Sequence, residues 1–361
     1  MNYRKWLTIT LTLIGLLCLA VVGINLHIDH YAVRLALFSG DKPLYPASYP
    51  DGMNQHLFNT EYVLRHPDQF DSFFFGTSRI WVMDVGKIPQ GRFYNMSYSE
   101  GLPVQHLAII KAFLEKGVKI KNVVVGLDGF CFDKPPADHE TQLMRIMHPD
   151  AGGPSRLKIF GIYFFRKPDL VELKGWRERK RNLKPERRFT MDRQGLVLRW
   201  RHLDRFIEET GKPYFDYKVE KYEPQTYKQN ITELSFAAIQ ELIDLSRKHH
   251  FRLIFYISPS YYLIDVNESE ALFKIKKRLA QLTDFYDFSG MNSVTTDPMN
   301  YYEEVHFRYR VADMVIKRIF GAGTADVSDD FGVLVTKETI DQHLAEQQQD
   351  LDRYLRDAHL K

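Results

Sequence analysis

The stretch FDSFFFGTSR, residues 70–79, decides the fold. An apolar, aromatic run that ends in Gly-Thr-Ser is typical of a buried strand that stops at a tight turn. Ligands of a parallel α/β sheet bind at the carboxyl ends of its strands, so Ser78 can present its hydroxyl to that crevice. Amides at the start of the next helix can stabilise an oxyanion there. The simpler interpretation is that Thr77 or Ser78 caps this helix, and the stretch alone favours it.

The segments that follow alternate between helix and strand. Apolar positions recur with helical spacing before the buried run NVVVGL, and the same alternation returns near residue 232. We expect helices at 102–117, 232–249, 268–282 and 308–320, and strands at 70–76, 122–127, 252–257 and 285–288. Strand, helix, strand with short links predicts a three-layer α/β/α sandwich with a parallel sheet, flavodoxin-like in layout.

The N-terminus predicts a membrane anchor. Residues 6–26 contain no charged side chain, and a helix of that length spans a bilayer core of about 30 Å. Arg4 and Lys5 precede it, so the positive-inside rule places the rest of the chain outside the cytoplasm. The expected location is the bacterial cytoplasmic membrane, with one span and an extracytoplasmic domain. A cleaved signal peptide is the main alternative, although no small-x-small site ends the run.

Four regions make up the predicted organisation. They are an anchor at 1–27, a membrane-proximal lead-in at 28–69, an α/β domain at 70–321 and a tail at 322–361. The lead-in has weak periodicity and is expected to hold one helix followed by irregular chain. The domain carries an insertion at 135–230, whose residues 156–201 hold 15 Lys and Arg against 5 Asp and Glu. The tail contains an amphipathic helix at 336–358, suited to docking or pairing through Ile340, Leu344, Leu351 and Leu355.

Composition argues against several classes of protein. The formal net charge of +3 is too small to indicate nucleic-acid binding. Cys18 lies in the apolar run and Cys131 in the soluble part, so no disulfide joins them. His249 and His250 are adjacent on a predicted helix, where their side chains diverge, and no Cys/His cluster has metal-ligand spacing. Neither a metal nor an organic cofactor is expected, and no glycine-rich phosphate loop is found.

A second motif precedes the last predicted core helix. Residues 301–307 read YYEEVHF, with Glu303 three residues before His306. A carboxylate at this spacing can orient the imidazole, which can then act as general base towards a serine. Asp297 and Glu304 are alternative carboxylates. The combination of this motif with the earlier strand-Gly-Thr-Ser is much rarer than either part alone.

Together these motifs resemble the SGNH/GDSL hydrolase superfamily, in particular its membrane-anchored envelope branch of D-alanine transfer and alginate O-acetyltransferase proteins. FGTSR at 75–79 matches the first family block, and EEVH at 303–306 matches the last. YNMS at 94–97 with Gly101 resembles the second block, and VGLD at 125–128 occupies the third. The third block lacks the family's Asn, and the acid of the last block is Glu instead of Asp.

The resemblance implies acyl-ester transfer or hydrolysis on a cell-envelope or secreted polysaccharide. Ser78 would be the nucleophile, His306 the base and Glu303 the orienting acid. Oxyanion donors would come from Asn95, Gly101 or nearby backbone amides. The implied partner is a polytopic membrane O-acyltransferase that hands over acyl groups.

Other charged residues leave alternatives open. Arg79 either steadies an anionic intermediate or forms a salt bridge with Asp84 or another carboxylate. Asp128 either binds substrate hydroxyls or caps the following turn. The basic insertion contacts an anionic glycan or lipid headgroups, or it is simply a solvated face.

Two rival functions belong to other classes. The first is a catalytically inactive protein of the same fold that binds glycans or acts as a scaffold, and the missing third-block Asn favours it. The second is a plain membrane-tethered interaction domain that uses the C-terminal helix, and it requires Ser78 and His306 to lie far apart.

Overall fold

The computed structural model describes residues 3–40, 48–49, 52–136, 142–180, 189–216, 222–321 and 326–358. A six-stranded sheet forms the centre, with strand order β10-β7-β6-β4-β2-β3. Five strands are parallel and β10 is antiparallel to β7. The strands are β2 (Ser72–Gly76), β3 (Phe93–Ser97), β4 (Asn122–Leu127), β6 (Arg252–Ile257), β7 (Phe285–Asp287) and β10 (Val333–Val335). The α/β class and the mostly parallel sheet are therefore as predicted.

Helices cover both faces of this sheet, because successive strand residues point to opposite sides. Phe73 and Phe75 of β2 pack in one core with the helices of the first face, whereas Phe74 packs in a second core on the other. The first face is covered by α3 (Gln55–Arg65), α4 (Pro103–Glu115), α9 (Gln229–His249) and α10 (Tyr262–Leu282). The second face is covered by α11 (Tyr309–Phe320) and the 3₁₀ turn η1 (Ser78–Val82).

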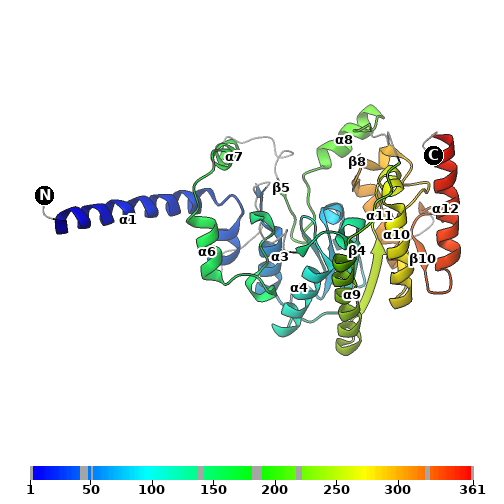
Figure 1. Ribbon diagram of the computed structural model, residues 1–361, viewed down its shortest axis with the longest axis horizontal. Coiled ribbons are helices and arrows are strands. Elements are labelled where there is room, and N and C mark those ends of the chain that lie inside the picture. Colours follow the sequence, from blue (N-terminus) through cyan, green and yellow to red (C-terminus); the bar gives the residue numbers. More distant parts are fainter. Residues whose placement is uncertain are drawn as a thin grey trace.

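The N-terminal helix α1 (Tyr3–Ile28) projects from the domain (Figure 1). It is long and apolar enough to cross a membrane, and none of its most apolar window is buried by the rest of the chain. The short helix α2 (Val33–Phe38) follows it. The segment 142–216 contains α6 (Arg156–Phe164), α7 (Leu170–Lys180), α8 (Arg201–Thr210) and β5 (Phe189–Thr190), which pairs with β1 (Ser48–Tyr49).

Three elements of the central sheet and its helical cover were not expected from the sequence. Residues 55–65 form α3 where irregular chain was expected, because the helix buries polar side chains such as Asn59 and Glu61 and so lacks a clear apolar stripe. The tail contributes β10 to the sheet edge, a strand of three residues that is too short to show a pattern. Strand β3 was also not identified as a strand.

The C-terminal helix α12 (Ile340–Asp357) docks on its own domain. Leu351 and Leu355 are buried against Leu263 and Val266 of α10, and Ile340 joins the main core. Lys276 of α10 forms a buried ion pair with Asp287 of β7 at 2.9 Å. Most of the apolar side chains of this helix are therefore buried against the rest of the chain.

Candidate active site

Ser78 stands at the carboxyl end of β2, as the first residue of η1. Thr77 provides the cap of this turn, because its Oγ1 accepts a hydrogen bond from the amide of Arg79 at 3.2 Å. The capping interpretation is therefore right for Thr77, and it leaves the Ser78 hydroxyl available for another partner.

That partner is His306. Nε2 of His306 lies 2.8 Å from Oγ of Ser78, although the two residues are 228 positions apart. The imidazole comes from a small antiparallel hairpin of β8 (Tyr301–Glu303) and β9 (His306–Phe307), which sits beside η1. The second rival function, a plain membrane-tethered interaction domain, required these two side chains to lie far apart, and the structure contradicts that requirement.

Glu303 supplies the carboxylate that contacts the imidazole of His306. Its Oε1 is bonded to Nδ1 of His306, which is its register partner across the hairpin. Burial is the largest single influence and opposes ionisation of Glu303. The hydrogen bond and charge interaction with His306, the Val305 amide and the charge of Arg79 together outweigh it and lower the pKa of the carboxyl. Asp297, the alternative acid, instead caps a neighbouring turn by accepting from the amide of Met299 at 2.9 Å.

Two tryptophans border the imidazole and were not identified from the sequence. The Trp81 ring is stacked near His306 with a centroid distance of 6.1 Å, and the Trp200 ring lies edge-on at 4.7 Å. Trp81 lies in the same turn as Ser78, which is a signal that sequence inspection can use. Trp200 comes from the segment before α8, and only the tertiary structure brings it here.

Arg79 and Asp128 form a buried ion pair. Arg79 Nη1 lies 3.2 Å from Oδ1 of Asp128, and the Thr77 hydroxyl donates to Oδ2 of Asp128 at 2.6 Å. Asp128 is 1% exposed and makes no side-chain cap, so the capping role considered for it was wrong. The carboxylate partner of Arg79 is Asp128 rather than Asp84. The pair fixes the turn that carries Ser78 to the end of β4.

Asn95 was expected as an oxyanion donor, and its contacts contradict this. Its Nδ2 donates to the carbonyl oxygens of Ile80 at 2.7 Å and Met83 at 3.2 Å, and its Oδ1 accepts from the Ser97 amide at 3.0 Å. Both amide hydrogens are therefore used, and the side chain is fully buried. Asn95 holds the turn after Ser78 against β3.

Gly101 lies where β2 ends. A Cβ at this position would come within 2.9 Å of the carbonyl oxygen of Gly76 and 2.7 Å of the His106 ring, so only glycine fits. This close approach places the Gly101 backbone next to the turn that carries Ser78.

Comparisons with known proteins add no assignment. No family model matches the sequence, and a search of curated proteins finds no significant relative. Among the residues that the structure describes, no group of three or more metal-ligating side chains comes together. The site is thus defined by its own geometry, a serine hydroxyl, an imidazole and a carboxylate in one hydrogen-bonded chain.

Proposed function

We propose that this chain is a membrane-anchored serine acyl-ester transferase or esterase that acts on a cell-envelope or secreted polysaccharide outside the cytoplasm. The observation that carries the proposal is the contact of Ser78 with His306, which in turn holds Glu303. A serine, a base and an orienting acid in this order are the parts that nucleophilic acyl transfer requires.

The proposed reaction has two steps. Ser78 Oγ attacks the acyl carbonyl carbon while its proton passes to Nε2 of His306, which then protonates the departing alkoxide as the acyl-serine forms. An acceptor hydroxyl or water next gives its proton to His306 and takes the acyl group, and the proton returns to Ser78. We assign the oxyanion to the backbone amides of Ser78 and Gly101, since the amide of Asn95 is engaged elsewhere.

Three features support the substrate class and location. The motifs resemble those of the SGNH/GDSL superfamily, whose layout we also propose for this sheet. Trp81 and Trp200 beside the imidazole offer ring faces of the kind on which sugars stack. Arg4 and Lys5 precede the apolar run of α1, which favours an extracytoplasmic domain. A polytopic membrane O-acyltransferase is the proposed source of the acyl group.

The full chain in detergent tests the chemistry. We expect hydrolysis of p-nitrophenyl acetate, and a fluorophosphonate probe should label Ser78, as read by peptide mass spectrometry. Ser78→Ala and His306→Ala should each lower the rate by about 10²-fold or more. His249→Ala, at an exposed histidine of α9, is the matched control and should behave as the parent.

A specific observation favours the second candidate, an inactive glycan-binding or scaffold protein. The third motif block lacks its amide donor, and the other candidate amide, Asn95, is fully used. Equal background rates in the parent and both variants, with no labelling of Ser78, would establish this alternative. Binding of acetylated and deacetylated polysaccharide to the same samples would then identify the ligand.

A further inference from the structure

The C-terminal end of α1 is hydrogen-bonded to the C-terminal end of α6. The Asn25 side-chain amide donates to the carbonyl oxygens of Phe164 at 3.0 Å and Arg166 at 2.8 Å. These carbonyls lie at the C-terminus of α6, where a helix leaves such groups without intrahelical partners. Asn25 is the second-last residue of the apolar run 6–26, so the C-terminus of α6 lies at the boundary of the bilayer that α1 would cross.

Helix α6 turns an apolar face away from the domain. Leu157, in the first turn of α6, and Phe165, which directly follows the helix, are 82% and 60% exposed. Ile159 and Tyr163, on the opposite side, are buried in the core. In Figure 1, α6 runs crosswise to α1 at the edge of the domain nearest the membrane helix, as a helix lying along a membrane surface does.

Helix α7 continues this surface on the other side of α1 (Figure 1). Val171 is 74% exposed. A mostly apolar groove of about 530 Å³ separates α1 from α7, lined by Gly23, Ile24, Leu173 and Trp176 among others. Part of its lining lies inside the apolar run of α1, so the groove opens at the depth of the bilayer. Tryptophan is enriched at the membrane–water interface, where the end of the apolar run would lie.

The same surface is basic. Residues 156–180 carry eight Lys and Arg against three Asp and Glu, a net charge of +5. Lys158, Lys167, Lys174 and Arg177 are exposed. Basic residues around exposed apolar side chains are typical of helices that lie in the interface of an anionic membrane.

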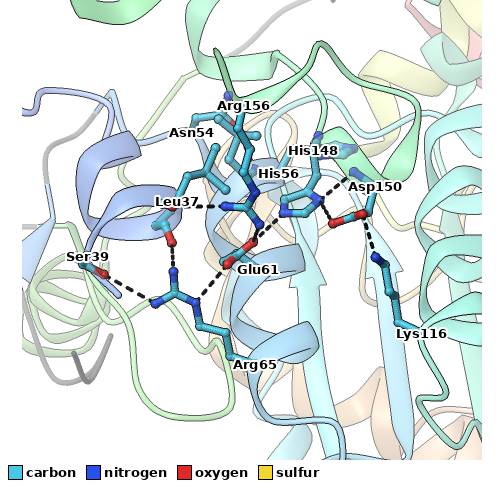
Figure 2. A network of polar contacts seen from close by, with 12 residues as sticks. Leu37, Ser39, Asn54, His56, Glu61, Arg65, Lys116, His148, Asp150 and Arg156 are labelled. Carbon is cyan, nitrogen blue, oxygen red and sulfur yellow. Dashed lines mark hydrogen bonds and ion pairs between the residues drawn. The ribbon is translucent and has the colours of Figure 1, made fainter. Parts of the chain in front are cut away.

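A polar network holds α6 rigidly on the domain (Figure 2). Arg156 donates to Glu61 at 2.9 Å and to the carbonyl oxygen of Leu37 at 3.0 Å. Glu61 also accepts from Arg65 at 2.9 Å and contacts His148 at 2.8 Å. The exposed face of α6 is therefore presented in a fixed orientation relative to α1.

We propose that α6 and α7 form a second membrane contact, which lies on the bilayer crossed by α1, inserts Leu157, Phe165 and Val171, and binds anionic phospholipid headgroups. The occupant is a lipid surface because the face is continuous with the transmembrane helix and carries the complementary charge. The contact would fix the orientation of the domain above the membrane. This inference rests on α1 and does not depend on the proposed enzymatic function.

Spin labels on the full chain in nanodiscs test the insertion. Leu157→Cys, Phe165→Cys and Val171→Cys are labelled one at a time in a Cys18→Ser background, and Leu334→Cys, at a residue that is 50% exposed on β10, is the control. In discs of phosphatidylcholine and phosphatidylglycerol, the ratio of oxygen to nickel-chelate collision rates should be several-fold higher at the three test sites than at the control. Ratios equal to the control would overturn the proposal and leave this face to a protein partner.

Lipid charge and protein charge test the headgroup contact. Replacing phosphatidylglycerol by phosphatidylcholine should lower the collision ratio at Leu157→Cys. The double substitution Lys158→Glu with Lys174→Glu should lower it too, because each substitution should weaken the insertion equilibrium by about fivefold. The control Lys248→Glu with Lys337→Glu makes the same change of net charge at exposed sites outside α6 and α7. It should leave the collision ratio unchanged. Insertion that is indifferent to both changes would overturn the anionic-lipid assignment.

Discussion

Replacing Glu303 by Gln isolates the contribution of the carboxylate charge. Gln has the same length and can still accept the hydrogen bond from Nδ1 of His306, so the imidazole keeps an orienting partner. The change removes only the negative charge that would stabilise the imidazolium formed when Ser78 loses its proton.

The expected magnitude follows from the exposure of the pair. Two unit charges about 4 Å apart interact by about 1 kcal/mol in bulk water and about 4 kcal/mol at an effective dielectric of about 20. The Glu303 side chain is 37% exposed and that of His306 19%, so solvent screens the pair substantially. A value of about 1.5–2 kcal/mol is reasonable, and it corresponds to a loss of about 10–30-fold in kcat. His306→Ala, which removes the base itself, should cost about 10²–10⁴-fold.

The assay is the hydrolysis of p-nitrophenyl acetate by the full chain, with kcat and KM measured separately. Glu304→Gln, a change of the neighbouring carboxylate, is the matched control and should leave kcat near that of the parent. A loss in Glu303→Gln as large as that in His306→Ala would refute the argument from screening. An unchanged kcat in Glu303→Gln would show that this carboxylate does not act on the imidazole.

Three further predictions concern the stability of the scaffold. Hydrogen bonds from His148 and Arg65 overcome the effect of burial and lower the pKa of Glu61 to about 2. The ionised carboxylate therefore contributes fully to the free energy of unfolding above about pH 4.5, and this contribution is lost as the pH falls towards 2. Glu61→Gln should therefore cost about 3 kcal/mol at pH 7 and less at pH 3 in urea titrations, and an equal cost at both pH values would count against this. Asn95→Ala removes three buried hydrogen bonds and should cost about 2–4 kcal/mol and lower turnover, whereas parental stability would show that the amide is dispensable. Asp287 contacts both the buried Lys276 of α10 and Nε2 of His343 of α12, the latter at 2.8 Å. Asp287→Asn leaves Lys276 without its charged partner and should cost about 3–5 kcal/mol and speed hydrogen exchange in α12, so unchanged exchange there would disprove the coupling.

Sequence patterns predicted an element correctly where its buried residues are apolar and close together in the sequence. The run that ends at Gly76 predicted β2, and NVVVGL predicted β4, because buried parallel strands are nearly continuous apolar runs. The spacing of Glu303 and His306 predicted that the imidazole meets a carboxylate, since three residues bring both to one hairpin. The N-terminal helix, apolar and long enough to cross a membrane, was evident for the same local reason.

These patterns did not predict which polar side chains are buried. Helix α3 buries polar side chains whose partners lie far away in the sequence, as with Glu61 and His148, which are 87 positions apart. The oxyanion role expected for Asn95 failed because its partners, the carbonyls of the turn after Ser78, are reached only once β3 lies beside β2. Residue type identifies a polar group, but only its neighbours show whether that group is free to act.

The sequence by itself determined the class of the fold, the long apolar N-terminal helix and the chemical types at the candidate site. The tertiary structure decided that Ser78 and His306 meet, that Arg79 and Asp128 bind each other, and that Trp200 joins the site. The physical reason is the range of the interactions. Hydrophobic periodicity is a property of neighbouring residues, whereas the contacts of a buried charge or a catalytic hydroxyl join segments that come together only when the chain folds.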